Sequence, residues 1–132
     1  MTSSTLSAPP RRRRTVVAAW ILQLLAAAAF MAAGGFKLAG APQMVQLFEQ
    51  VGFGQWLRYV TGGLEMAGAV LLLIPARAAW GGLLLAVVMA GAVFTHLVLI
   101  GGSPIPALLL LAVTATVAWL RRESLPFGRR GL

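Results

Sequence analysis

Two long stretches of the chain carry no charged residue, and their lengths constrain the fold more than any other feature. One covers residues 15–36 and the other residues 78–120, where His96 is the only titratable side chain. A helix rises about 1.5 Å per residue, so the first stretch gives ~33 Å, enough to cross the ~30 Å core of a bilayer. The second gives roughly 65 Å, so it must fold back and cross twice. These lengths predict an integral membrane protein.

The composition agrees with that class and narrows the partners. Of the 132 residues, 59% are apolar, above the ~45–50% of soluble domains. The net charge is +8, but the arginines gather at 11–14, before the first apolar stretch, and at 121–130, after the last. Basic residues at span ends set topology and hold anionic headgroups, so we expect a lipid bilayer and no nucleic acid as partner. The absence of cysteine excludes disulfides, thiolate nucleophiles and cysteine-ligated metals.

We expect an all-α fold, an integral membrane four-helix bundle with a short amphipathic helix between the first two spans. The predicted spans cover residues 15–36, 57–74, 79–100 and 105–120. Residues 1–14 are then a disordered basic tail, 15–120 the transmembrane domain and 121–132 a basic cytoplasmic tail. A cleaved signal peptide is the alternative for the first span, but its apolar region would be only ~7–15 residues long.

Residues 41–56 differ from the spans because they are amphipathic. Their apolar side chains follow the i, i+3, i+4, i+7 spacing of one helical face, at Met44, Leu47, Phe48 and Val51. The spacing predicts a short helix lying along the membrane surface or against the bundle. A structured loop with incidental periodicity is the alternative.

Small residues at four-residue spacing predict helix-packing faces. Gly82, Ala86 and Ala90 form one such series, and Ala29 and Ala33 form another. Faces of this kind let two helix backbones come close.

The basic residues also predict the orientation. If the N-terminus is cytoplasmic, nine of the eleven basic residues fall on the cytoplasmic side, and only Lys37 and Arg58 fall on the other. Cytoplasmic loops carry the excess of Lys and Arg, so both termini should be cytoplasmic.

Lys37, Glu65 and His96 form a candidate intramembrane polar cluster, because antiparallel spans bring them to one layer in the outer half. A charge inside the bilayer costs ~2.5–3.5 kcal/mol, so Lys37 and Glu65 should face inward and pair. One hypothesis is a buried clamp that fixes helix register, with His96 donating to a backbone carbonyl or a threonine. The other is a proton-handling or quinone-headgroup site that uses the near-neutral titration of histidine. A third is that the three residues are unconnected.

These residues do not specify a reaction, so no catalytic residue is assigned. One His and one Glu are too few ligands for zinc, so no metal is expected. Gln23, deep in the first span, is expected to make an interhelical hydrogen bond.

Several short motifs lie at characteristic separations: GFKLAG at 35–40, YVTGGLE at 59–65, LIP at 73–75 and MAGA…HL within 89–97. With the amphipathic segment ending near Gly52, they resemble the DoxX/DoxX-like family of small four-helix membrane proteins over residues 23–120. The resemblance implies a multi-pass protein of the bacterial cytoplasmic (inner) membrane, with Lys37 and Glu65 at the family's polar positions. It also implies a role in a membrane redox complex, since the family includes subunits linked to thiosulfate–quinone oxidoreduction.

Three functions follow from these observations. The first is an accessory or anchor subunit of a membrane-associated oxidoreductase or stress-response complex, with a protein partner and no activity of its own. The second is a stand-alone quinone- or small-molecule-interacting membrane protein, with quinone as the candidate cofactor. It requires a pocket beside Glu65 that opens to the lipid or to the outer face. The third is a membrane-protein assembly factor acting through small-residue faces.

Overall fold

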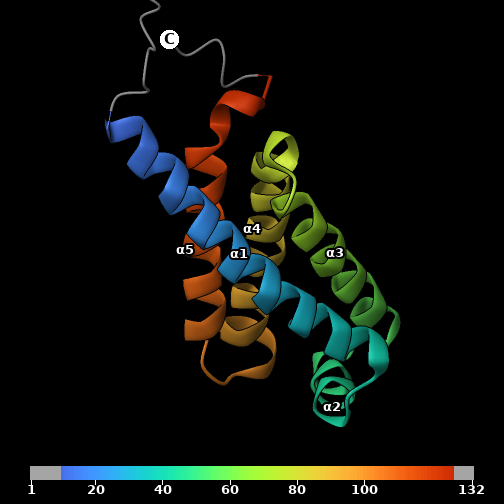
Figure 1. The fold of residues 1–132 in the computed structure, drawn as a ribbon. Helices are drawn as coiled ribbons and strands as arrows, with labels where there is room; N and C mark the ends of the chain where they lie inside the picture. Colours follow the sequence, from blue (N-terminus) through green and yellow to red (C-terminus); the bar gives the residue numbers. More distant parts are fainter. Residues whose placement is uncertain (1–9, 127–132) are drawn as a thin grey trace, which may run out of the picture.

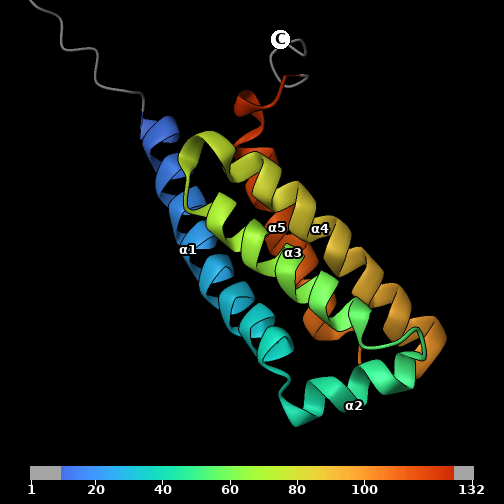
Figure 2. The same cartoon turned by 90° about the vertical axis from the view of Figure 1, so that its right-hand side faces the viewer.

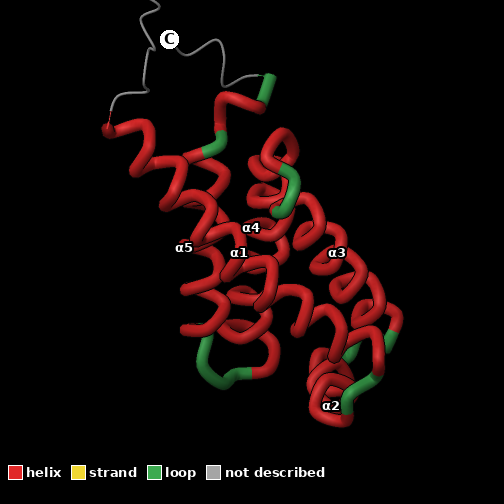
Figure 3. The backbone as a smooth tube through the Cα atoms, in the orientation of Figure 1, coloured by secondary structure: helices red, strands yellow, loops and turns green. Residues whose placement is uncertain are grey.

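Every regular element of the described chain is helical. The structure is a computed structural model that describes residues 10–126, and the side chains of 13–126 (Figures 1 and 3). Its α-helices are α1 (Pro10–Ala39), α2 (Pro42–Val51), α3 (Trp56–Leu72), α4 (Ala78–Phe94) and α5 (Ile105–Leu120). Short 3-10 turns cover Pro75–Arg77 and Arg122–Ser124, and a π-helical segment, Thr95–Ile100, continues α4. The predicted all-α class is confirmed.

The first helix begins earlier than predicted. It starts at Pro10, so residues 10–14 belong to α1 and not to a disordered tail. Proline suits a first helical position, because its missing N–H would be unpaired there, and arginine is a good helix former. At the other end, the 3-10 turn and the buried Leu125 follow α5, where only a tail was expected. The rest of both predicted tails, 1–9 and 127–132, lies outside the described residues.

Four helices run side by side. Helix α1 packs against α3 and α5, and α4 packs against the same two helices from the other side. The start of α1, the α3–α4 turn and the end of α5 lie at one end of the molecule (Figure 1). Helix α2 runs across the opposite end and contacts α1, α3 and the π-helical segment (Figure 2). The predicted short helix between the first two spans is therefore confirmed.

The packing faces differ in part from those predicted. Gly82 is buried against α5, where an added Cβ would lie 2.7 Å from the carbonyl oxygen of Thr114. Ala90, placed on the same face from the sequence, is exposed. On α1, Ala29 is exposed too, and the buried positions are Ala19, Gln23, Ala26, Ala27, Phe30 and Gly34. Their spacing of three and four residues follows the 3.6-residue turn, whereas a strict four-residue repeat drifts around the helix.

The outer surface of the helices is apolar. Large exposed apolar side chains occur on α1, α3, α4 and α5, including Leu25 and Val87, which are 64% and 70% exposed. Within the described residues, two helical segments are long and apolar enough to cross a membrane, Arg13–Ala39 with 27 residues and Pro75–Ile100 with 26. Only 28% and 11% of their most apolar windows are buried. The helix Ile105–Leu120 is also apolar but shorter.

We predict that Gly82→Ala lowers the stability of the protein in detergent by about 1–3 kcal/mol, because the new methyl group would meet the backbone of α5 and force the helices apart. The control is Gly91→Ala on the same helix, where an added Cβ meets no atom within 4 Å. That control should be neutral or should stabilise by up to ~1 kcal/mol through helix propensity. Thermal unfolding of both variants is the measurement, and equal midpoints would contradict the close contact.

Candidate functional site

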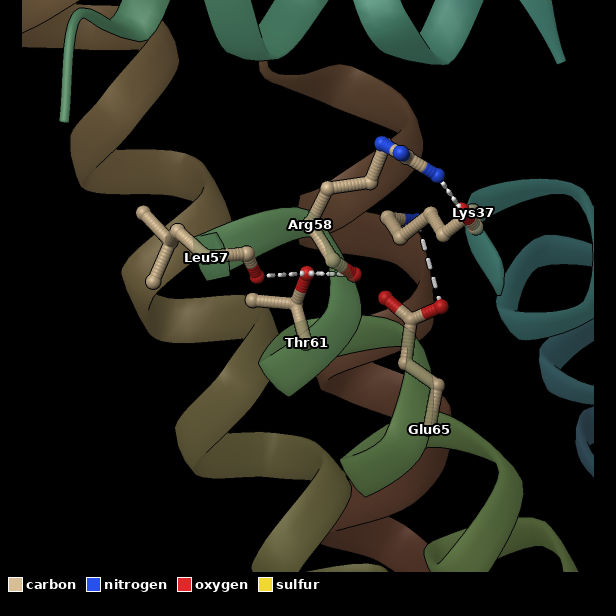
Figure 4. Close-up of polar contacts among 5 residues, drawn as sticks. All are labelled: Lys37, Leu57, Arg58, Thr61 and Glu65. Carbon is tan, nitrogen blue, oxygen red and sulfur yellow. Dashed lines mark hydrogen bonds and ion pairs between the residues drawn. The ribbon is translucent and has the colours of Figure 1, made fainter. Parts of the chain in front are cut away.

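Lys37 and Glu65 form an ion pair between α1 and α3. The ammonium Nζ of Lys37 donates to Oε2 of Glu65 at 3.1 Å (Figure 4). The Glu65 side chain is 2% exposed and the Lys37 side chain 16%. Gly62 makes the approach possible, because a Cβ added there would lie 2.9 Å from Cβ of Lys37. The backbones therefore come close enough for the lysine to extend along α3 to the carboxylate.

Arg58 supports this pair from the same end of α3. It is only 5% exposed, its Nη1 donates to the backbone carbonyl of Lys37, and its Nε donates to Oε1 of Gln55 at 2.8 Å. The amide of Gln55 in turn donates to the carbonyl of Val45 at 3.0 Å. The guanidinium is thus a second donor to a carbonyl at the end of α1, which also accepts from the backbone N–H of Gly40 at 3.3 Å. Through Gln55 the same side chain links α1, α2 and α3.

Sequence reasoning missed this role of Arg58, because it counted the residue only among the basic residues of the outer side. The spacing of Arg58 and Glu65 in the sequence could have indicated this role. Arg58 precedes Glu65 by seven residues, which is two helical turns, so both side chains leave α3 on one face.

A cavity of about 430 Å³ lies beside the ion pair, and Lys37, Glu65 and His96 all line it. Its other walls are mostly apolar and come from α2, α3 and α4. The apolar face of α2 contributes Met44, Leu47, Phe48 and Val51, while the glutamines and Glu49 of that helix are exposed. The hydroxyl of Thr61, also in the wall, donates to the carbonyl of Leu57 at 2.8 Å (Figure 4).

His96 is held by the turn that follows its own helix. Its Nδ1 lies 2.9 Å from the carbonyl oxygen of Gly101. A carbonyl only accepts, so Nδ1 carries the hydrogen and donates it. In the described part of the chain, no hydrogen bond joins His96 to Lys37 or Glu65. The structure brings the three candidate residues to one cavity and pairs two of them, and whether they act chemically stays a prediction.

Gln23 makes the expected interhelical hydrogen bond. It is fully buried, and its Nε2 donates to the carbonyl of Leu72 in α3 at 2.7 Å. Its Oε1 accepts from Nε of Arg121, just after α5, at 2.8 Å. This network joins three helices near the other end of the molecule. Among the described residues, no group of three His, Asp or Glu side chains is placed to hold a metal ion.

The comparisons with known proteins give one match. The model of a family described as the DoxX-like family matches residues 21–122, most of the chain. Comparison with curated proteins and with solved structures found no match. The matched range contains the ion pair, the cavity and both hydrogen-bonding partners of Gln23.

We predict that Lys37 and Glu65 are energetically coupled. Breaking a buried ion pair from one side costs ~3–5 kcal/mol, and the partial exposure of Lys37 should make the loss in Glu65→Gln or Lys37→Met smaller than that. The double variant removes both charges and should regain part of the loss. Unfolding in detergent over the double-mutant cycle is the measurement, with exposed Glu49→Gln as a neutral control. Strictly additive losses would argue against the pair.

Proposed function

The chain belongs to the DoxX-like family, and on this premise we propose that it is a four-span membrane protein that binds a small amphipathic molecule beside Lys37 and Glu65. The spans are α1, α3, α4 with its π-helical continuation, and α5. Family membership and the two long apolar helices fit a small membrane protein. The number of spans, the orientation and the ligand are the further steps of the proposal.

The exposed surface supports embedding in a bilayer. A core helix of a soluble protein is mostly buried, whereas less than a third of the most apolar window of each long helix here is buried. Large contiguous apolar surfaces are unfavourable in water and mark interaction or membrane surfaces. In hydrocarbon the same side chains face a solvent as apolar as they are, so their exposure carries no penalty.

The two shorter helices can also span the bilayer if their ends lie at the membrane–water interfaces. Helices α3 and α5 have 17 and 16 residues, about 25 Å each, and a short span is accommodated by thinning of the bilayer. Exposed Trp80 and Trp119 lie near the end that holds the start of α1 and the end of α5, and Phe53 and Trp56 lie near the end that holds α2. Aromatic side chains of this kind favour the two headgroup regions.

The orientation is proposed from the basic residues. Placing both termini in the cytoplasm of a bacterium, with the protein in the inner membrane, leaves only Lys37 and Arg58 on the far side. In the structure these two residues are engaged with Glu65 and with the end of α1. They therefore need no anionic headgroup on that side.

We predict that an alkaline phosphatase fused after Leu132 is inactive and a fluorescent protein there is bright, because folded phosphatase requires export. The same phosphatase inserted at Gly102, in the exposed turn before α5, should be active. Activity and fluorescence of cells expressing each fusion are the measurement. An active phosphatase at Leu132 would reverse the proposed orientation.

The observation that carries the binding function is the cavity itself. A stand-alone ligand-binding role requires an opening beside Glu65, and about 430 Å³ of space lies there, within the ~300–1,000 Å³ typical of small-molecule sites. Apolar walls with a few convergent polar groups are the usual composition of such sites. A quinone is the candidate ligand, since it combines a small hydrogen-bonding ring with an apolar tail.

We predict that decylubiquinone raises the thermal unfolding midpoint of the purified protein, because a ligand that binds only the folded state stabilises it. Gly91→Leu should weaken this effect at least tenfold in affinity, since Gly91 lines the cavity and an added side chain has open space before it. Gly63→Leu is the matched control, open to a Cβ but outside the cavity lining. Equal affinities in the two variants would place the ligand elsewhere.

The accessory-subunit role and the assembly-factor role both stay predictions. Each requires a protein partner, and copurification followed by mass spectrometry tests them together. A defined partner recovered with the wild type and with Gly91→Leu alike would favour these roles over ligand binding.

A further inference from the structure

The cavity has an apolar mouth on the side of the molecule. Val60 and Leu64 of α3 and Val87 and Gly91 of α4 belong to its lining, and all four residues are exposed. Val87 is the most exposed of the three large side chains, at 70%. The rim between α3 and α4 therefore consists of side chains that belong in hydrocarbon and not in water.

The mouth exists because α3 and α4 touch at one end only. Near their connecting turn, a Cβ added to Gly81 would lie 2.9 Å from the carbonyl oxygen of Gly68, so the backbones are in contact there. Toward α2 the two helices separate (Figure 1). At Gly91, on the separated part of α4, an added Cβ meets nothing within 4 Å. The space between the helices is therefore open at the level of Gly91.

Helix α2 covers the end of the cavity that faces water. Phe48 is the buried residue of this helix, and Met44, Leu47 and Val51 line the cavity with it. Its polar side chains are on the opposite, exposed face. A molecule arriving from the aqueous side would have to displace this helix, whereas one arriving from the bilayer meets only the rim of α3 and α4.

The polar end of the cavity offers hydrogen bonds without net charge. Lys37 and Glu65 neutralise each other, and the ammonium keeps further N–H groups while Oε1 of the carboxylate can still accept. Because Nδ1 of His96 is committed to Gly101, Nε2 of the neutral ring is an acceptor. A ligand with a charged head group would have to compete with one partner of the ion pair. A ligand whose head group is uncharged and carries hydrogen-bond donors or acceptors would not.

We infer that the cavity is entered sideways from the bilayer and holds the small uncharged head of a lipid whose tail remains between α3 and α4. This inference rests on the proposed binding function and adds to it the route and the class of ligand.

The chain contains no cysteine, so one introduced cysteine carries a nitroxide spin label at a unique place. The label at Val87→Cys, in the protein reconstituted in lipid nanodiscs, should collide often with oxygen, which dissolves in the bilayer, and rarely with a water-soluble nickel chelate. The control label at Gln46→Cys, on the exposed polar face of α2, should show the opposite preference. Frequent nickel collisions at Val87 would overturn the lateral route.

Two added molecules then test the class of ligand at the Val87 label. Decylubiquinone, with an uncharged head, should lower oxygen collisions at least twofold, and decanoate, with a charged head and a tail of similar length, should not. The same additions to a Gly91→Leu background should change nothing. Equal protection by decanoate would overturn the uncharged head. If the label faces the bilayer but neither molecule protects it, the binding function fails while the lateral opening stands.

Discussion

Contact between helix backbones is the interaction on which the rest of this structure depends. In a bilayer, turning an apolar side chain inward gains little, because the lipid is equally apolar, so helices associate through close packing and hydrogen bonds. Here Gly82 lies against the backbone of α5, and Gly62 lies against Lys37 at the end of α1. The Lys37–Glu65 pair follows from the second contact, since a larger residue at 62 would push the lysine away.

The cavity is the other result of this packing. At Gly81 the glycine lies against the backbone of α3, so α3 and α4 are in contact there. At Gly91 an added Cβ would meet no atom within 4 Å, so the space between the two helices stays open. Lys37, Glu65 and His96 line that opening. One pair of helices thus contributes both a close contact and a site, at different levels along its length, and α2 contributes part of the wall of that site.

Helical geometry explains how much of this could be read from the sequence. Rise per residue and antiparallel order were enough to bring Lys37 near Glu65, and a lone buried amide such as Gln23 had to find a partner on another helix. Arg58 was missed because its charge was assigned to an aqueous side and its helical face was not considered. A pocket beside Glu65 entered the sequence analysis only as the requirement of one hypothesis, because its existence depends on how far α3 and α4 separate, which no single helix pattern records. The π-helical turn around His96 was equally invisible to a regular 3.6-residue periodicity.

The hydrogen bonds of Gln23 have a consequence for how the protein is made. They reach Leu72, 49 residues later in the chain, and Arg121, 98 residues later. Synthesis therefore delivers the amide of the first helix long before its last partner. Until α5 leaves the ribosome, the side-chain carbonyl of Gln23 has nothing from that helix to accept from, and a buried acceptor without a donor is unfavourable. A chain that ends before α5 therefore lacks the donor that Arg121 supplies to this oxygen in the finished protein.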